Sequence, residues 1–296
     1  MAAYSASDPD QRLHRRLATF NAARLKLAAP SPLWEDELAH EYRMRVLEGH
    51  YLEALRAAVQ PAASASVGDT AHFIRWFEAL AHTGPGQQHP LFDWLAHEAT
   101  LAQMRWFLTQ EAAGEAGFED LLAYTQVKLP PQPKLECARN FWDEMGHGKQ
   151  SAMHGQMLDH MVRELDLHPS IDTTVWESLA LANTMVGLAT TRRYAYHAIG
   201  ALGVIELTAP GRVGQVATGM RRLGLSGRAR AYFDLHAALD VSHARAWIRE
   251  VIRPLVETDP GCARFIAEGA LMRLVCGQRC FARYSHALRA EETAAC

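Results

Sequence analysis

The chain has 296 residues, of which 49% are hydrophobic and 21% are charged, and its formal net charge is −3. This composition is typical of a globular protein with a large buried core, and it excludes a disordered chain. The balance of charge gives no basic field for nucleic acid, and no apolar run reaches the roughly 18 residues of a membrane span.

The start of the chain and its cysteines indicate a cytoplasmic protein. Residues 1–10 lack the basic start and the apolar stretch of a signal peptide. The five cysteines are odd in number and widely spread, which argues against a disulfide framework. Cys276 and Cys280 lie one turn apart on a predicted helix, and we expect them to be buried small apolar side chains.

The first 86 residues are predicted to form a helical extension. Residues 1–30 are polar and rich in alanine, and Ser31-Pro32 is an N-cap followed by proline at the first helical position. A helix is predicted from there to about residue 59, with a linker over 61–69. A short helix at 73–80 then precedes a Gly/Pro-rich break at 84–90.

Residues 87–290 are predicted to form the main domain. Long helical segments alternate with short connections marked by Pro and Gly, and neither strand alternation nor an internal repeat is evident. We therefore expect an all-α bundle. The predicted helices span 90–113, 118–126, 134–165, 172–208 with a break near 189–192, 213–223, 228–252 and 260–288.

One predicted helix carries a metal-binding pattern. His236, Asp240 and His243 are spaced i, i+4 and i+7, which places them within about 60° of one another on one helix face. Two imidazoles and a carboxylate are ligands that a transition metal takes. The same stripe also occurs on ordinary solvated helix faces.

Glu206 is the most informative acidic residue. It lies in an apolar helical stretch, where a carboxylate is costly to bury unless it is paired or binds a metal. A buried salt bridge to an arginine is the alternative. Gly200 and Gly203 in the same stretch predict a close approach by another element.

Two further acids lie in helical surroundings. Glu144 is followed by His147 at the Glu-x-x-His spacing of diiron bundles and by His154 ten residues later, and geometry alone leaves both histidines open. Glu111 ends a helical segment and shares a face with apolar residues; the alternative is a solvated helix end. Together, four carboxylates and three or four histidines on four helices suffice for two first-row metal ions, and suit iron or manganese better than zinc.

These motifs resemble the heme-oxygenase-like diiron oxidases and oxygenases, often described as iron-containing redox enzymes. Residues 140–154 resemble the family's Asn-x-x-x-Glu-x-Gly-x-Gly-x-x-x-x-x-His segment, and 198–210 resemble its small-residue helix ending in Glu-x-x-x-Pro. Residues 232–243 resemble its His-x-x-x-Asp-x-x-His segment. The motifs occur in the family's order, and the resemblance covers roughly residues 88–250.

The resemblance implies a heme-oxygenase-like bundle of about seven core helices that holds two iron ions. O₂ would be a co-substrate, an external donor such as a ferredoxin or a flavin reductant would supply electrons, and a peroxo-diferric species would be the oxidant. The family motif favours His154 over His147 as the histidine ligand after Glu144, and His147 stays a reserve candidate. The implied metal ligands, which are also the implied catalytic residues, are Glu111, Glu144, His154, Glu206, His236, Asp240 and His243.

The substrate is less well indicated. By resemblance, the chemistry would be N-oxygenation, oxidative C–C cleavage or desaturation of a small amine- or carboxylate-bearing metabolite, derived from an amino acid in specialised metabolism. Arg192 lies nearly on the face of Glu206, four turns earlier, and either contacts a substrate carboxylate or forms a structural salt bridge. The first 86 residues, outside the resemblance, would serve dimerisation or close the substrate pocket, and we expect a homodimer.

Three other functions compete with this hypothesis. A metal-independent relative of the same fold, of the thiaminase or quinone-cofactor-synthesis type, would not need all seven ligands. An iron-storage protein would bind many irons per chain without substrate-dependent O₂ uptake. A purely structural bundle would be destabilised by replacing Glu206 but would not respond to iron.

Overall fold

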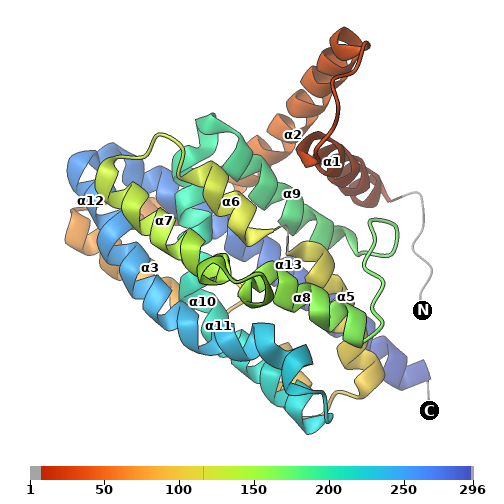
Figure 1. Ribbon diagram of the computed structural model, residues 1–296. Helices are drawn as coiled ribbons and strands as arrows, with labels where there is room; N and C mark the ends of the chain where they lie inside the picture. The colour runs from red at the N-terminus through yellow and green to blue at the C-terminus, as the bar shows by residue number, and fades with distance from the viewer. Residues whose placement is uncertain (1–7, 116, 295–296) are drawn as a thin grey trace.

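The computed structural model describes residues 8–115 and 117–294, and these ranges contain helices and no strand (Figure 1). The predicted all-α class is therefore confirmed. The main helices are α1 (Pro9–Leu25), α2 (Trp34–Ala63), α3 (Thr70–Thr83), α4 (Leu91–His97), α5 (Leu101–Gly114), α6 (Phe118–Thr125), α7 (Pro131–Glu144), α8 (His154–Glu164), α9 (Trp176–Thr190), α10 (Ala195–Arg222), α11 (Gly227–Ala246), α12 (Arg253–Thr258) and α13 (Ala263–Ala294), with a π-helical turn (Trp247–Ile252) joining α11 to α12.

Helix α10 is the centre of the bundle, and α4, α11 and α13 pack against it. Small residues let α10 and α13 cross closely. A Cβ atom at Gly200 would lie 1.9 Å from the carbonyl oxygen of Ile266, and one at Gly269 would lie 2.0 Å from that of His197. A Cβ at Gly203 would lie 2.5 Å from the Trp247 ring. The close approach predicted at Gly200 and Gly203 is confirmed.

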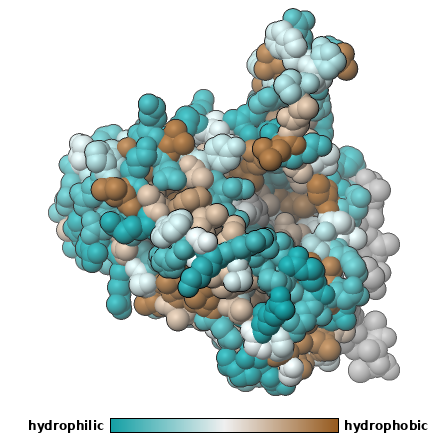
Figure 2. Space-filling view, in the orientation of Figure 1, coloured by the Kyte–Doolittle hydropathy of each residue, from teal (hydrophilic) through white to brown (hydrophobic). Residues whose placement is uncertain are grey.

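The N-terminal part of the chain is divided between the body and a projection. Leu52 of α2 and Phe73 of α3 belong to the main core, whereas Leu17, Phe20 and Met44 form a small separate core between α1 and α2. The first half of α2 projects from the body (Figure 1), and apolar side chains lie exposed on the projection (Figure 2). The domain boundary between residues 86 and 87 stays a prediction, although helices before it contribute to the main core.

Several predicted helix boundaries are wrong. Residues 9–25 form a helix that was not predicted, and the segment 90–113 is interrupted before α5, where Thr100 and Gln103 form a capping box. Helix α10 continues through Pro210, since that proline removes one backbone hydrogen bond while the surrounding helices hold the segment in place. The predicted helix 134–165 is broken over residues 145–153, with consequences for the site described below.

The remaining expectations about the whole chain concern membranes and cysteines. No helix in the described part of the chain is both long and apolar enough to cross a bilayer. Cys276 and Cys280 are buried and unpaired, as predicted, and Cys137 and Cys262 are too. Cys296 lies outside the described residues.

Candidate metal centre

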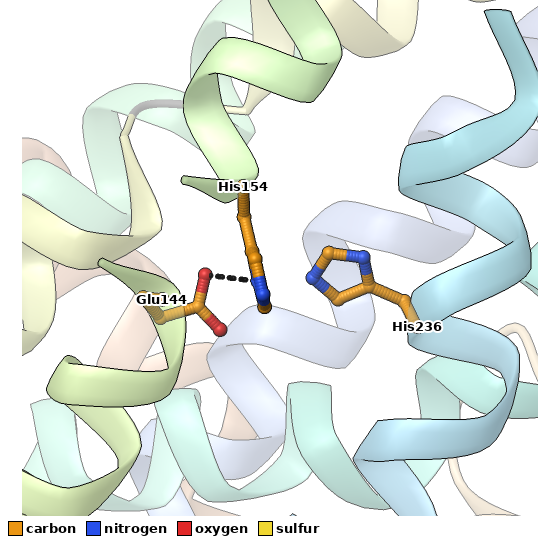
Figure 3. Close-up of side chains that lie close together, drawn as sticks. All are labelled: Glu144, His154 and His236. Atoms are coloured by element: carbon orange, nitrogen blue, oxygen red, sulfur yellow. Dashed lines mark ion pairs between the residues drawn. The ribbon is translucent and has the colours of Figure 1, made fainter. Parts of the chain in front are cut away.

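Two groups of potential ligands lie inside the bundle. Cluster 1 consists of Glu144, His154 and His236, and cluster 2 consists of Glu206, Asp240 and His243. Within each cluster, one potential ligand atom from each residue lies within 4.8 Å of the others. The side chains of cluster 1 converge from α7, α8 and α11 (Figure 3). The i, i+4, i+7 spacing on α11 supplies three of the six residues, as the sequence predicts.

The break between α7 and α8 assembles cluster 1. Glu144 ends α7, and the chain then turns through three residues in the left-handed region, at φ values of 58° for Gly146, 53° for His147 and 81° for Gly148. A Cβ atom at Gly146 would lie 2.3 Å from the carbonyl carbon of Ala152, so only glycine fits there. The turn brings Nδ1 of His154, the first residue of α8, to 2.7 Å from Oε2 of Glu144.

Two side chains of α7 form hydrogen bonds with residues of cluster 2. Asn140 donates from Nδ2 to Oε1 of Glu206 at 2.7 Å, and Glu206 is only 2% exposed. Nδ1 of His243 lies 3.4 Å from the other oxygen of Glu206, while Nε2 of the same ring lies 3.0 Å from Oδ2 of Asp143. No arginine pairs with Glu206 among the described residues, so the alternative of a buried arginine salt bridge is not supported.

Burial of so many ionisable groups shifts their pKa values. Burial raises the pKa of Glu144, and burial together with the charge of Glu206 raises that of Asp240. Burial lowers the pKa of His236 to about 4. At His243 burial acts to lower the pKa, but the carboxylates of Glu206 and Asp143 outweigh it and raise the pKa to about 9. An interior with an excess of carboxylates favours the binding of a cation.

The donor set fits divalent metal ions. Nδ1 of His154 and Nδ1 of His243 are buried and face carboxylate oxygens, yet neither forms a hydrogen bond of normal geometry with a described residue. Each cluster therefore presents a buried ring nitrogen without a hydrogen-bond partner, next to a carboxylate oxygen. Nitrogen and oxygen ligands of this kind bind first-row transition metals such as iron.

Both clusters adjoin one cavity of about 80 Å³. Three polar residues outside the clusters also line it, namely Glu115, Tyr232 and Arg273. Burial and the charges of Glu119 and Glu144 raise the pKa of Glu115 to about 8. The apolar part of the wall is formed by Phe118, Leu121, Leu181, Met185, Ile205, Ala209 and Val213.

The structure brings six of the seven predicted ligands together but leaves Glu111 apart. Glu111 belongs to neither cluster and instead lies near Arg212, Arg273 and Tyr284. Glu115, one helical turn later, lines the cavity and was not singled out by the sequence analysis. Helical periodicity could have indicated Glu115, because it lies four residues after Glu111 and shares its helix face. Nothing in the sequence indicated which of the two turns faces the clusters.

Two other candidates lie away from the cavity. His147 is 66% exposed at its side chain, with Nε2 3.2 Å from Oδ1 of Asp143, so the structure places His154 rather than His147 in cluster 1. Arg192 is exposed and donates from Nη1 to the carbonyl oxygens of Tyr124 and Thr125 at 3.4 Å each. It forms a link to the end of α6 and does not line the cavity.

Comparison with protein families now identifies the chain. Residues 105–278, more than half of its length, match the family model described as iron-containing redox enzyme. The chain belongs to this family. The match covers α6 to α12 and contains every residue of both clusters, so the resemblance inferred from the sequence motifs is confirmed.

Solved structures confirm the heme-oxygenase-like fold of this iron-containing redox enzyme. Two crystal structures of a CADD-like protein of unknown function from Nostoc punctiforme superpose with TM-scores of 0.55 and 0.57. Both are 16% identical in sequence to this chain; they cover 74% and 75% of it, and 98% and 97% of their own chains. A search of curated proteins gives no match.

Proposed function

We propose that this iron-containing redox enzyme is an O₂-activating non-heme diiron oxygenase or oxidase that acts on a small amine- or carboxylate-bearing metabolite. The observation that carries the proposal is the pair of carboxylate–histidine clusters beside one buried cavity. Each cluster offers the ligands of one iron ion, and a substrate in the cavity would lie next to both. The reaction would be N-oxygenation, oxidative C–C cleavage or desaturation of that metabolite.

In this proposal the clusters divide the ligands between two sites. Glu144, His154 and His236 would hold one ion, and Glu206, Asp240 and His243 the other. Glu115 is a further carboxylate at the same cavity and takes the place that the sequence analysis gave to Glu111. When bound, the two irons would bind O₂ and supply electrons that reduce it, and an external ferredoxin or flavin reductant would return them to the ferrous state.

The protein's own residues would orient the ligands. Asn140 hydrogen-bonds to one oxygen of Glu206, and Asp143 hydrogen-bonds to the ring of His243. Metal ligands in proteins are typically oriented by hydrogen bonds of this kind. Tyr232 lies between Glu115 and His236, with its ring centroid 4.2 Å from that of His236. Burial, followed by the charge of Glu115, raises its pKa, so its hydroxyl keeps its proton and is available as a hydrogen-bond donor.

Storage of iron is less well supported than catalysis. A store needs room for many ions, whereas the cavity has about 80 Å³, enough for several water molecules or a small group. A metal-independent relative remains the main alternative, and it predicts activity that does not depend on the cluster residues.

Anaerobic titration of the metal-free protein with Fe(II), followed by Mössbauer spectroscopy, tests the proposal. We expect two irons per chain in the wild type, and a transient absorbance change on mixing with O₂ that the true substrate accelerates. His154→Ala should lose at least one iron, because it removes a ligand of cluster 1. His147→Ala is the matched control and should keep both, since His147 is exposed and outside the clusters.

A wild-type protein that binds no stoichiometric iron would rule out the proposal and favour a metal-independent relative. Two bound irons without any reaction with O₂ would remove the oxygenase assignment while leaving the metal centre in place. Many irons per chain would indicate storage.

A further inference from the structure

One arginine lies at the cavity and a second lies close to it, neither with an obvious internal function. Arg273 of α13 lines the cavity, and its Nε atom is buried with no hydrogen-bond partner among the described residues. Arg212 of α10 lies near Arg273, and its guanidinium stacks on the rings of Phe92 and Phe281 at 5.9 and 5.3 Å. A buried guanidinium nitrogen is costly unless it is paired, so the partnerless Nε of Arg273 beside a cavity points to a missing anion.

The charges around the pair support this conclusion. Glu111 is the carboxylate outside the clusters that lies near both arginines. Burial raises the pKa of Glu111, and Arg212 and Arg273 partly oppose this. Glu111 can balance only one of the two guanidinium charges. Asp240, the other acid near Arg212, belongs to cluster 2, whose carboxylates the proposed function assigns to metal.

The wall that lies beside Arg273 is apolar. Besides Arg273, the cluster residues, Glu115 and Tyr232, the cavity is lined mainly by apolar side chains such as Phe118, Leu181 and Met185. Such a wall favours a carbon skeleton and offers no second strong anion site. The cavity thus has a cationic group, an apolar wall and the two clusters in contact with one small space.

We propose that Arg273, supported by Arg212, binds the carboxylate of the substrate, and that the substrate's carbon skeleton lies along the apolar wall beside the two clusters. That the bound carboxylate is a substrate rests on the proposed function. The anion site itself does not, because it is formed without a metal. The planar fork of a guanidinium matches the two oxygens of a carboxylate, which selects carboxylic acids over their neutral amides. The site therefore narrows the substrate class to a carboxylate with an apolar body.

The binding of matched acids and amides to metal-free protein tests the site. The probes are acetate, butyrate, hexanoate and octanoate, each compared with its amide by isothermal titration calorimetry. We expect at least one acid to bind at least tenfold more tightly than its amide. Arg273→Gln should abolish that preference, and Arg273→Lys should restore only part of it, because an ammonium group cannot form the paired contact.

A second variant protects the test against a simple loss of folding. Glu111→Gln removes the acid that competes for the two arginines, so it should increase the affinity for the acid by at least threefold. Misfolding cannot produce a gain in affinity. Arg192→Gln is the matched control, since this exposed arginine does not line the cavity, and its acid preference should equal that of the wild type.

Different results would contradict the proposed anion site and the proposed diiron function. Equal binding of acids and amides by the wild type, or a preference that survives Arg273→Gln, would overturn the anion site whatever the iron content. An acid preference that depends on Arg273 in a protein unable to bind iron would support the anion site while excluding the diiron function.

Discussion

At the scale of single residues, Asp143 connects two histidines of different exposure. One oxygen lies 3.0 Å from Nε2 of the buried His243, and the other lies 3.2 Å from Nε2 of the exposed His147. The contact leaves Nδ1 of His243 directed at Glu206. Carboxylates in this position fix the orientation of a metal-binding imidazole and strengthen it as a ligand.

Replacing Asp143 should weaken metal binding without unfolding the protein. We expect Asp143→Asn to lower the affinity for Fe(II) by about tenfold, since the ring of His243 loses its charged partner. A competition titration with a chelator measures this effect. Asp159→Asn, at an exposed position of α8, should leave the affinity unchanged, and an equal loss in both variants would show that the effect is only one of surface charge.

Regular helical spacing indicated His236, Asp240 and His243, and apolar surroundings indicated Glu206. The family resemblance implied Glu144 and His154. The sequence could not predict the choice between Glu111 and Glu115. The two acids lie one turn apart on the same face, so helical periodicity treats them alike. Which of them meets the clusters depends on how far α5 extends along its axis relative to α10 and α13, which is a property of the packed structure.

At the scale of elements, the crossing of α10 and α13 sets the distance between Glu206 and Arg273. Gly269→Ala would place a methyl group 2.0 Å from the carbonyl oxygen of His197, which cannot move without shifting α10. We expect a loss of about 3 kcal/mol in the free energy of unfolding, as for other overpacked sites. Denaturant unfolding measures this loss.

Gly211→Ala, on α10, provides the control. A Cβ at this position meets nothing within 4 Å, and alanine favours helix over glycine. This variant should be as stable as the wild type or up to about 1 kcal/mol more stable. A similar loss in both variants would mean that the helix crossing is not the cause.

Helix α1 docks on α9 through a buried histidine, which makes this contact sensitive to pH. His14 is 2% exposed and stacks on Trp176 at 5.6 Å, and burial, together with the charge of Arg279, lowers its pKa from 6.5 to about 4. The neutral ring is favoured in the folded state. Its contribution to stability is therefore complete above pH 6.5 and is lost as the pH falls from 6.5 toward 4.

Metal-free wild type should lose up to about 3 kcal/mol of stability over this range on account of His14. His14→Gln should remove that share of the loss, because glutamine does not titrate. Denaturant unfolding of both proteins at neutral pH and near pH 4.5 measures the difference. Identical losses would show that other groups, such as His236, account for the acid sensitivity.

The helix boundaries that sequence analysis missed depend on tertiary structure. The predicted helix 134–165 contains glycines at 146 and 148, which are poor helix formers, but the left-handed conformation of His147 has no sequence signal of its own. Pro210 predicted a helix end, yet α10 continues because its neighbours pack against it on several sides. Local propensity is a weak guide where an element is held by packing.

At the scale of the whole molecule, the sequence predicted the all-α bundle from helical periodicity and short connections. It also predicted a helix from Ser31 to about residue 59. The structure buries apolar residues in the second half of this helix, at Leu52 and Leu55, but leaves Trp34, Leu38 and Tyr42 exposed on the projecting half of α2. Periodicity shows that a helix has an apolar face, but not which element covers it.

The broken segment between α7 and α8 has a consequence for the handling of the protein. Glu144 and His154 close a loop over residues 145–153, which includes the exposed Lys149. A metal ion held by both residues would act as a clip across this loop, because it restricts the opening that a protease needs. Trypsin should therefore cleave after Lys149 at least tenfold more slowly in the Fe(II)-bound protein under anaerobic conditions.

Cleavage after the exposed Arg43 on the projecting half of α2 serves as an internal reference, since that site is far from the clusters along the chain and should not respond to metal. His154→Ala should remove the protection at Lys149 and leave cleavage at Arg43 unchanged. If metal slowed both cleavages equally, the ion would be stabilising the whole fold rather than clipping one loop. If metal slows only the cleavage at Lys149, limited digestion becomes a simple readout of metal occupancy.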